Sequence, residues 1–380
     1  FGSSQFGSRA ISIRAAARLC QQQMRWLAVL TTSHVIAAIG TPAAPVIIST
    51  DPGVDDSIAL LLSAASTEID LRAVCINFGS LHNVSQLADN ALTVLALAER
   101  QDVPVYLGAR DPLAAPFRDL GGRSFHGETG LGGAQLPVMS RGSVSAKSCA
   151  EVIVEACRTW SPKPILVSLA PLTNIAVALA LEPDLPALCP DLFLMGGSVV
   201  ASGNVSPVSE ANIANDAEAA EKVLGAGFTT RIASLDVTML TWLDDAYLRS
   251  FQKLPNLAGP FVWNITRFYT GAYNRTGHFE KGGMPLHDPS ALLMLLRPSF
   301  YKWEHWPTTV VTSAFPSATR GMLIADRRGG PFKPPPDPNA TLHFATDVNL
   351  QGVRRFLYER IATLPAHTTQ RWQDSELLFM

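Results

Sequence analysis

The chain has 380 residues, of which 47% are hydrophobic and 16% charged, and this is the composition of a globular protein with one large domain or two smaller ones. The formal net charge of −2, with no run of Lys or Arg in the body of the chain, gives no reason to expect nucleic acid or an anionic membrane as a partner. No uncharged apolar run reaches the roughly 20 residues that a membrane-spanning helix needs.

Five cysteines are spread widely along the chain. Because their number is odd and no Cys-x-x-Cys pair occurs, neither a zinc site nor a dithiol motif is indicated, and a disulfide framework is not expected in a chain of this length. We expect buried free thiols in a reducing compartment. The cysteines are Cys20, Cys75, Cys149, Cys157 and Cys189.

The first 44 residues contain several Arg and Ser residues but no acid, since the first Asp or Glu of the chain is Asp51. This composition is typical of an organellar transit peptide. Alternatively, residues 26–39 are the apolar part of a secretory signal, or the segment is disordered or an artefact of the gene model, as the chain starts at Phe1. We expect a cytoplasmic protein with residues 1–44 as an extension and residues 45–380 as one domain.

After Pro45, short apolar runs alternate with segments whose apolar residues recur at helical spacing. Residues 46–48 form the first predicted strand, because a Val-Ile-Ile run lies between Pro45 and a turn at Pro52 and Gly53. The further predicted strands cover residues 71–78, 104–107, 165–167, 192–195 and 231–235. The predicted helices cover residues 57–65, 84–100, 146–160, 172–181, 216–225, 289–296 and 348–361.

This alternation predicts an α/β fold, a single Rossmann-like domain with a mostly parallel central sheet flanked by helices. From Asp244 onward the chain is predicted to be more helical, and residues 329–338 are predicted to be a Pro/Gly-rich surface loop. No internal repeat or interdomain linker is visible, which favours one domain. Ligands of such folds bind where strands end and loops begin.

The first predicted strand is followed by a segment with three carboxylates within six residues, Asp51, Asp55 and Asp56. One or two of them are explained as a helix cap or as partners of the helix dipole. Three carboxylates at the end of one strand are not explained in this way, because they repel one another unless a cation lies among them. Oxygen ligands favour Ca²⁺ or Mg²⁺ over zinc. The segment therefore predicts a metal site.

A second acid, Asp288, also precedes a predicted helix, with Pro289 suited to the first helical position. As a lone helix cap, Asp288 needs no further explanation. Beside the first cluster it would complete a metal site, and the adjacent His287 would be a proton donor. Considered alone, His287 is more often a hydrogen-bonded structural histidine.

The segment from Asp51 to Asp56 closely resembles the opening motif of the inosine-uridine-preferring nucleoside hydrolases. Six further segments between residues 45 and 360 resemble motifs of that family and occur in the same order. They are His126-Gly127-Glu128-Thr129-Gly130-Leu131, Pro171-Leu172-Thr173-Asn174-Ile175, Met195-Gly196-Gly197 followed by Gly203-Asn204-Val205 and Glu210-Ala211-Asn212, Leu235-Asp236-Val237-Thr238, His287-Asp288-Pro289, and Thr319-Arg320-Gly321.

The resemblance implies roles for individual residues. In the family, the positions matching Asp51, Asp56 and Asp288 ligate Ca²⁺ together with a backbone carbonyl, which here would belong to Leu169. The position matching Asp55 binds ribose hydroxyls. Further substrate contacts would come from Ser80, from His126 near the base, from Met195 and Asn212, and from Asn204 and Glu210 near the 5′ end of the sugar.

The resemblance also implies a reaction, the calcium-dependent hydrolysis of the N-glycosidic bond of ribonucleosides to ribose and free base. Asp51 would activate a metal-bound water, and His287 would protonate the leaving base. Carboxylates and oriented amides around the sugar would stabilise the positive charge that develops on the ribose. By the same resemblance, the substrate is a small-molecule nucleoside and the protein is a homodimer or homotetramer.

Two positions depart from the family pattern. Ser49 stands where the family usually has an acid, and Ser80 stands where it has a sugar-contacting Asn, unless His82 or Asn83 reaches in from the longer loop. These departures motivate the alternative of a degenerate nucleoside- or ribose-binding member with little turnover. A dehalogenase-like phosphotransferase is a third hypothesis, but its nucleophilic Asp would have to stand at Ser49.

The sequence does not indicate which base is preferred. Aromatic side chains between residues 244 and 283 are candidates for stacking on the base, and equally for the core of a helix. These are Trp263, Phe268, Tyr269 and Tyr273.

Overall fold

The structure is a computed structural model that describes residues 43–134, 141–277, 282–329 and 341–366. The predicted N-terminal extension lies outside these residues except for residues 43 and 44. The predicted Pro/Gly-rich loop at 329–338 lies outside them except for Gly329, and Cys20 lies outside them as well.

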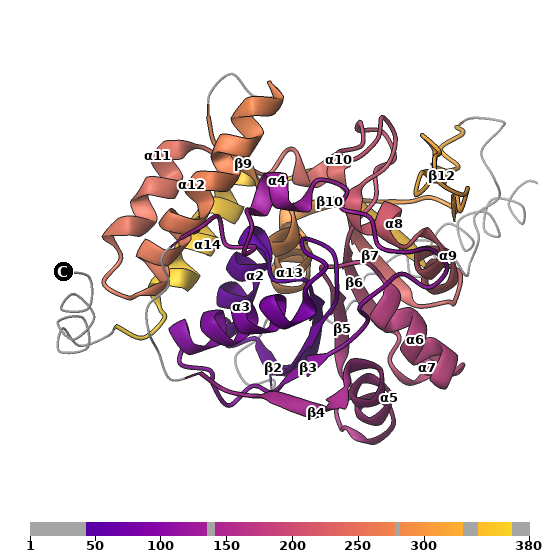
Figure 1. Ribbon diagram of the computed structural model, residues 1–380, viewed down its shortest axis with the longest axis horizontal. Coiled ribbons are helices and arrows are strands. Elements are labelled where there is room, and N and C mark those ends of the chain that lie inside the picture. Colours follow the sequence, from indigo (N-terminus) through magenta and orange to yellow (C-terminus); the bar gives the residue numbers. More distant parts are fainter. Residues whose placement is uncertain (1–42, 135–140, 278–281, 330–340, 367–380) are drawn as a thin grey trace, which may run out of the picture. The chain divides into compact units, whose positions relative to one another are not determined.

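In the described part of the chain, nine strands form a central sheet in the order β10-β13-β7-β6-β5-β1-β2-β3-β4 (Figure 1). Neighbouring strands are parallel, except that β10 is antiparallel to β13, so the prediction of a mostly parallel sheet is confirmed. The strands are β1 (Ala44–Thr50), β2 (Ile69–Ile76), β3 (Val105–Leu107), β4 (Val144–Ser148), β5 (Ile165–Ser168), β6 (Asp191–Met195), β7 (Thr229–Ala233), β10 (Tyr301–His305) and β13 (Leu342–Val348).

Helices flank the sheet on both faces (Figure 1). On one face α2 packs against α3, α12, α13 and α14, and on the other α6 packs against α5 and α9. The helices are α2 (Val54–Ala64), α3 (Val84–Leu97), α4 (Gly122–His126), α5 (Cys149–Thr159), α6 (Thr173–Leu181), α7 (Leu185–Leu188), α8 (Ala211–Asn215), α9 (Ala217–Leu224), α10 (Leu235–Thr238), α11 (Asp245–Ser250), α12 (Ala258–Thr276), α13 (Asp288–Leu296) and α14 (Leu350–Ala362), with short 3₁₀ helices at Phe251–Lys253 and Pro298–Phe300.

The central strands are buried on both faces, which explains their uninterrupted apolar runs. In β1, all residues from Pro45 to Thr50 are buried. One core cluster combines sheet residues such as Ile47 and Leu192 with Ile153 of α5 and Val223 of α9. Each buried aliphatic side chain of this kind stabilises the fold by about 1.5–3 kcal/mol.

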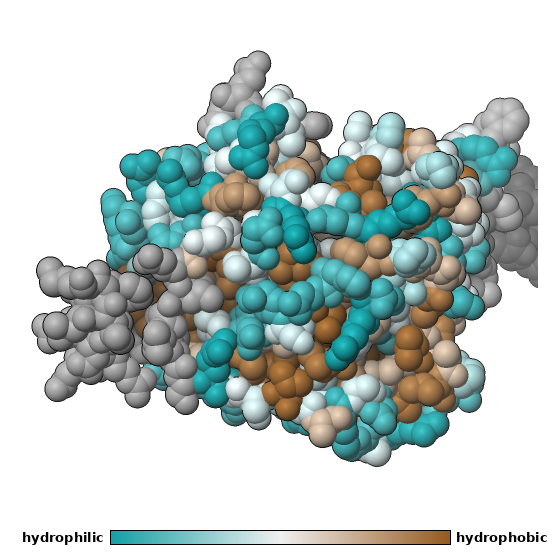
Figure 2. All heavy atoms as spheres, in the orientation of Figure 1, coloured by the Kyte–Doolittle hydropathy of each residue, from teal (hydrophilic) through white to brown (hydrophobic). Residues whose placement is uncertain are grey.

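Two short antiparallel pairs lie outside the central sheet. They are β8 (Trp242–Leu243) with β9 (Met284–Pro285), and β11 (Thr308–Val310) with β12 (Leu323–Ala325). On the face shown in Figure 2, hydrophilic side chains are interspersed with smaller hydrophobic patches. Among the described helices, none combines the length and the apolar character needed to cross a bilayer.

The structure corrects two predicted segments. The predicted helix at 146–160 begins only at Cys149, because residues 144–148 form β4 and Ser148 caps α5 in a capping box with Glu151. The prediction of a more helical chain after Asp244 is wrong where β10 and β13 extend the sheet. In β13, Leu342, Phe344 and Ala345 are buried, but the other residues beside the edge strand β10 are only partly buried, so the sequence shows no long apolar run there.

The structure also corrects the prediction for two cysteines. Cys157 and Cys189 form a disulfide between α5 and the residue after α7, with their Cα atoms 5.5 Å apart. They lie close only because α5 packs on α7, which the spacing of the cysteines does not reveal. Cys75 and Cys149 are buried free thiols, as predicted.

Candidate active site

The central strand β1 lies where the order of the sheet reverses. From β1 the chain proceeds outward through β2, β3 and β4, then returns to the other side of β1 as β5 and continues through β6 and β7. The crevice at the carboxyl ends of strands at such a switch point is the usual ligand site of open α/β sheets. Asp51 directly follows β1, Leu169 directly follows β5, and Met195 ends β6. The fold thus brings three separate predicted segments to one edge of the sheet.

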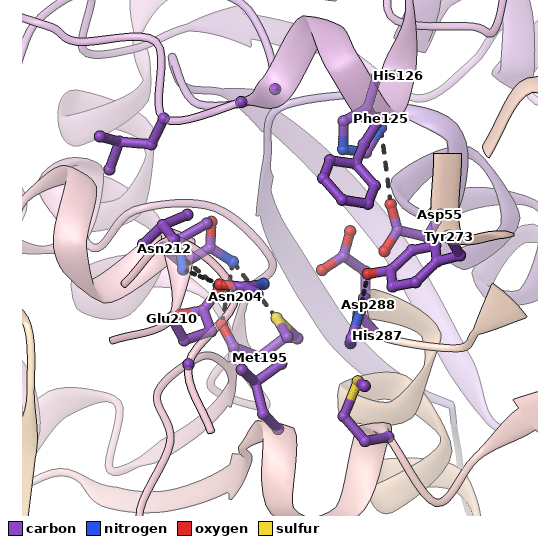
Figure 3. A pocket seen from close by; sticks show the side chains of 18 of the residues that line it. Asp55, Phe125, His126, Met195, Asn204, Glu210, Asn212, Tyr273, His287 and Asp288 are labelled. Carbon is purple, nitrogen blue, oxygen red and sulfur yellow. Dashed lines mark hydrogen bonds and ion pairs between the residues drawn. The ribbon is translucent and has the colours of Figure 1, made fainter. Parts of the chain in front are cut away.

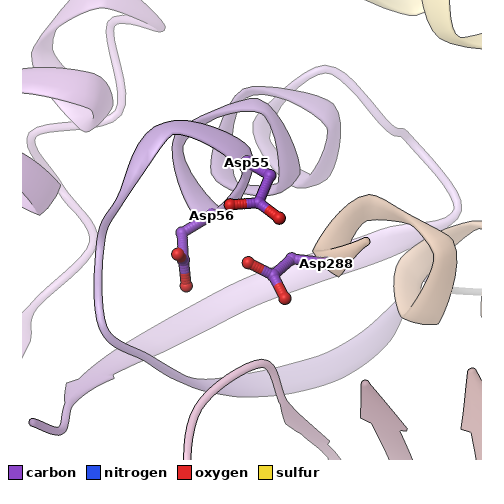
Figure 4. Close-up of side chains that lie close together, drawn as sticks. All are labelled: Asp55, Asp56 and Asp288. Carbon is purple, nitrogen blue, oxygen red and sulfur yellow. The ribbon is translucent and has the colours of Figure 1, made fainter. Parts of the chain in front are cut away.

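Three carboxylates converge at this edge (Figure 4). One oxygen each of Asp55, Asp56 and Asp288 lies within 4.8 Å of the others, and all three side chains are buried. Asp55 and Asp56 lie in the first turn of α2, and Asp288 begins α13. Because α2 and α13 pack against each other, the positive ends of two helix dipoles meet at these carboxylates.

Without a cation among them, ionisation of these three aspartates is unfavourable. Burial raises the pKa of Asp55 to about 6, and burial followed by the neighbouring charge of Asp55 raises the pKa of Asp56 and of Asp288. Within the described residues, no Lys or Arg forms an ion pair with them, and His126 Nδ1 lies 4.0 Å from an Asp55 oxygen. A cation would offset this repulsion, and carboxylate oxygens are hard ligands. The donor set therefore fits an ion such as Ca²⁺.

Asp56 is held by three donors of the turn between β1 and α2. Its Oδ1 accepts from Thr50 Oγ1 at 2.5 Å and from Asp51 N at 3.3 Å. Its Oδ2 accepts from Gly53 N at 3.0 Å, so Asp56 also caps α2. Asp56 is thus the aspartate to which the predicted role of a helix cap applies. This role does not exclude that Asp56 also binds a metal. Thr50 orients a site carboxylate, although the sequence analysis did not single it out.

Asp51 lies beside these three carboxylates but outside their convergent group. Its Oδ2 accepts a short hydrogen bond from Ser80 N, and its backbone carbonyl accepts from Ser80 Oγ at 2.5 Å. Gly79 approaches the Asp51 carboxylate so closely that a Cβ would collide with it, so this position requires glycine. Burial, followed by the charge of Asp56, raises the pKa of Asp51. A buried carboxylate with a raised pKa is suited to accept a proton.

A cavity of about 370 Å³ opens beside the carboxylates, within the range of roughly 300–1,000 Å³ that is usual for small-molecule sites. Every residue of the predicted site lines this cavity except Asp51 and Ser80. In Figure 3, one wall carries Met195, Asn204, Glu210 and Asn212. The opposite wall carries Asp55, Phe125, His126, Tyr273, His287 and Asp288.

The first wall is fixed by the hydrogen bonds of Asn212. Its Nδ2 donates to the Leu169 carbonyl at 2.9 Å and to the Met195 carbonyl at 3.2 Å. These bonds join the ends of β5 and β6 to the start of α8. The Leu169 carbonyl retains a second lone pair, because a carbonyl oxygen accepts two bonds.

Glu210 is buried and holds the same wall through backbone groups. Its carboxylate accepts from the amides of Gly197 at 2.8 Å, Asn212 at 2.8 Å and Ile213 at 3.1 Å. Burial raises the pKa of Glu210, while these three amides oppose the rise. Nearby, Asn204 Oδ1 accepts from the amide of Ala211 at 3.0 Å. This wall therefore presents a carboxylate and amide groups in fixed positions.

His287 lies in a chain of hydrogen bonds on the opposite wall. Its Nδ1 lies 2.8 Å from Thr238 Oγ1, and its Nε2 lies 2.6 Å from the Tyr273 hydroxyl. Burial, followed by the charge of His126, lowers the pKa of His287 to about 3, so the ring is neutral at neutral pH. The Tyr273 hydroxyl and the neutral His287 ring, which both line the cavity, are thus joined by a hydrogen bond.

His126 and Tyr269 surround Asp55. The His126 Nδ1 accepts from Val54 N at 3.1 Å, which leaves Nε2 as the protonated nitrogen, and burial lowers the pKa of His126 to about 4. The Tyr269 hydroxyl donates to Asp55 Oδ2 at 3.3 Å. Gly53 lies so close to the His126 ring that a Cβ would not fit. The aspartate, the imidazole and the phenol are thus fixed together at the cavity wall.

Ser49 and Ser80, which depart from the family pattern, do not line the cavity, and neither do His82 and Asn83. Ser49 is buried and its Oγ accepts from Asn174 Nδ2 at 3.1 Å. His82 is exposed, pairs with Asp111 at 3.0 Å and stacks on a phenylalanine. Asn83 caps α3. Neither His82 nor Asn83 therefore replaces the sugar-contacting Asn.

Among the aromatic residues of the cavity, Phe125 was not identified from the sequence, whereas Tyr269 and Tyr273 were candidates. Phe125 packs against Tyr273 with ring centroids 5.0 Å apart, and Tyr269 and Tyr273 lie one helical turn apart on α12. Of the four aromatic candidates, Tyr269 and Tyr273 line the cavity, while Trp263 and Phe268 do not. In the sequence, the spacing of four residues between the two tyrosines indicated that they act together, because it places both side chains on one helix face.

Comparisons with known proteins agree with this geometry. The family model of inosine-uridine preferring nucleoside hydrolases matches residues 46–355. The pyrimidine-specific ribonucleoside hydrolase RihA of Photobacterium profundum is 35% identical over 84% of this chain and 98% of its own length. The solved purine-preferring ribonucleoside hydrolase of Gardnerella vaginalis has a TM-score of 0.77 at 28% identity, covering 84% of this chain and 98% of that one.

A solved plant nucleoside hydrolase has a TM-score of 0.76 at 25% identity and covers 85% of this chain and all of its own. The match to the family model extends over far more than half of the 380 residues. The chain therefore belongs to the inosine-uridine-preferring nucleoside hydrolase family and is an enzyme that hydrolyses N-glycosyl bonds.

Proposed function

We propose that this enzyme hydrolyses ribonucleosides to ribose and free base and depends on Ca²⁺. The observation that carries the proposal is the group of buried carboxylates, with raised pKa values and no Lys or Arg partner among the described residues, at one end of a nucleoside-sized cavity. The names of the relatives support ribonucleosides as the substrate class.

On the resemblance to the family, the residues that would hold the ion are the carboxylates of Asp51, Asp56 and Asp288, with the backbone carbonyl of Leu169. Asp56 and Asp288 belong to the convergent group, and Asp51 lies beside it. Asp55 lies in the same convergent group and lines the cavity, which suits it to bind ribose hydroxyls at the edge of the ion. A bound Ca²⁺ would act as a Lewis acid toward sugar hydroxyls and toward the attacking water.

Asp51 accepts the proton of the water that attacks C1′. An O–C1′ bond then forms while the bond between C1′ and the base nitrogen breaks, and its electron pair leaves with the base. Positive charge develops on the ribose during this step. The carboxylate of Asp55 stabilises this charge, the side chain of Asn212 orients the sugar, and Asn204 and Glu210 face its 5′ end.

His287 supplies the proton that the departing base takes up. Support for this role comes from the Tyr273 hydroxyl, which lies 2.6 Å from His287 Nε2 and lines the cavity. The ring takes up a proton before this step and passes it from Nε2 to the Tyr273 hydroxyl while the hydroxyl donates its own proton to the base, so the ring ends the step neutral. Thr238 on Nδ1 keeps the ring oriented. His126 lies on the same wall, which suits it to a place near the base.

The test is release of ribose from inosine, uridine, cytidine and adenosine, with Ca²⁺ and with a chelator. We expect turnover of at least one nucleoside that stops in chelator and returns with Ca²⁺. No turnover of any nucleoside by folded, calcium-loaded protein would contradict the proposal. If such protein still bound a nucleoside in calorimetry, the alternative of a degenerate binding member would be correct.

We also propose that the protein is a homodimer or homotetramer, on the basis of its family membership. Light scattering coupled to gel filtration measures the mass of the assembly against the 40.8 kDa of one chain. We expect two or four times this mass, and a mass of one chain at micromolar concentration would contradict the proposal.

A further inference from the structure

The Thr319-Arg320-Gly321 segment has no part in the cavity, although it is one of the family-like motifs. None of its residues lines the cavity. Arg320 is nevertheless only 2% exposed, which is unusual for an arginine outside a ligand site. Burial of a guanidinium group is unfavourable unless its partners are well placed.

The guanidinium of Arg320 makes a two-pronged ion pair with Glu218. Its Nη1 and Nη2 lie 2.8 Å and 2.5 Å from the two carboxylate oxygens, and Nη1 also donates to the Ser313 carbonyl at 3.3 Å. Glu218 lies in the first turn of α9. The pair therefore fixes the 319–321 segment to a helix that packs on α6 in the core.

The backbone of the same segment holds the loop that forms one cavity wall. The Arg320 carbonyl accepts from Ser209 Oγ at 2.5 Å, and Ser209 forms an isolated β-bridge with Met322. Ser206 Oγ donates to the Ala318 carbonyl at 2.9 Å. Three contacts thus attach the loop formed by residues 203–210 to residues 318–322.

Ser209 in turn fixes both residues that face the 5′ end of the sugar in the proposed function. Its carbonyl accepts from the amides of Asn204 at 3.1 Å and Val205 at 3.2 Å. Glu210 follows it directly, and Figure 3 shows Asn204 and Glu210 together on the cavity wall. A short path of hydrogen bonds therefore leads from Arg320 through Ser209 to Asn204 and Glu210.

We propose that Arg320 and Glu218 are a positioning pair that sets the site of the sugar 5′-hydroxyl through Ser209. The inference rests on the proposed nucleoside hydrolysis and adds residues outside the cavity that control one part of the substrate. A pair that served only to stabilise the fold would affect all substrates equally. A positioning pair affects a substrate only when it has the group that the loop contacts.

The test compares each nucleoside with its 5′-deoxy counterpart. Arg320→Lys keeps the charge but loses the two-pronged geometry, and Ser209→Ala removes the contact to the Arg320 carbonyl while leaving the ion pair in place. Misplacing a binding group by about 1 Å costs on the order of 100-fold in rate. We therefore expect both variants to lose about 10–100-fold in kcat/KM for the nucleoside but less than about threefold for the 5′-deoxynucleoside.

Arg297→Lys is the matched control, because Arg297 pairs with Glu68 at 2.8 Å and does not line the cavity. It should leave both substrates unchanged. Equal losses on both substrates in Arg320→Lys and Ser209→Ala, or no loss on either, would overturn the inference. If the wild-type protein turns over no nucleoside, the proposed function fails separately. The same comparison is then made by calorimetric binding of nucleoside and 5′-deoxynucleoside, with the same selective loss expected.

Discussion

At the scale of single residues, the four site aspartates differ in the partners that surround them. Asp51 accepts from Ser80, Asp56 from Thr50 and from the turn backbone, and Asp55 from Tyr269. Asp288 stands at a helix start close to the other three charges. These differences are the physical basis for assigning different chemical tasks to residues of one type.

Asp51→Asn tests the assignment of the base. The amide keeps the shape of the side chain but cannot accept the proton of water, so turnover should fall by about 10²–10⁴-fold, the usual contribution of a general base. Ribose release and circular dichroism measure activity and folding. The control is Asp111→Asn, since Asp111 is exposed and, among the described residues, forms an ion pair with His82 alone. Activity within threefold of wild type in Asp51→Asn would refute the assignment.

Proton delivery to the base can be tested with His287→Ala and Tyr273→Phe. Purines depend most on protonation of the leaving base, so both variants should lose more activity on inosine than on uridine. Tyr273→Phe should show the same preference because it breaks the link to His287 Nε2. Kinetics on both substrates measure the ratio. Equal losses on inosine and uridine would exclude this route for the proton.

The pKa shifts predict how calcium binding depends on pH. Asp55 has a pKa of about 6 in the folded, metal-free protein and an ordinary pKa of 3.8, so the folded state binds more protons than the unfolded state between these values. The stability of the metal-free protein therefore falls as pH rises through this window, and the loss is complete above about 6. A bound cation removes this loss.

The stabilisation by Ca²⁺ should accordingly be larger at pH 7.5 than at pH 5. We expect the difference in Tm between calcium-loaded and chelator-treated protein to be larger by at least about 1–2 °C at the higher pH, which is the shift that ~1 kcal/mol produces in a domain of roughly 320 residues. The lowered pKa values of His126 and His287 act in both samples and largely cancel. Equal calcium shifts at the two pH values would contradict this expectation.

At the scale of elements, the site depends on where β1, α2 and α13 begin and end. The start of α13 could be predicted to within one residue, because Asp and Pro mark it. β1 was predicted as the apolar run 46–48 and extends two residues further at each end, and α2 begins at Val54, three residues before the predicted start. β4 and β13 could not be predicted in this way. β4 is mostly exposed, and β13 is stabilised by pairing with β7 and β10, which lie far from it in sequence.

The disulfide between Cys157 and Cys189 gives a prediction about α5 and α7. It closes a loop of 32 residues, so its reduction should lower the free energy of unfolding by roughly 2–4 kcal/mol. Activity at 25 °C should stay unchanged, because neither cysteine lines the cavity. Thermal melts with and without reductant, with peptide mapping of the linked cysteines, measure this. An unchanged Tm in protein whose two thiols are shown to be free would contradict it.

At the scale of the whole molecule, successive strands are added on one side of β1 up to β4 and on its other side from β5 onward. This change of side brings the carboxyl ends of β1, β5 and β6 together. The sequence could predict the identity of most cavity residues, because family-like motifs mark them. It could not show that Ser49 accepts a hydrogen bond from Asn174, or that Tyr273 and His287 are hydrogen-bonded at the cavity wall. Those contacts depend on packing between segments that no local pattern specifies.

The central claim is that the buried carboxylates form a calcium site on which ribonucleoside hydrolysis depends. The most direct measurement is stepwise addition of Ca²⁺ to chelator-treated protein, with bound calcium and ribose release followed in the same sample. We predict one tightly bound ion per chain and activity that rises in proportion to occupancy, with Asp288→Asn losing both. Full activity in protein that atomic spectroscopy shows to be free of calcium would contradict the account.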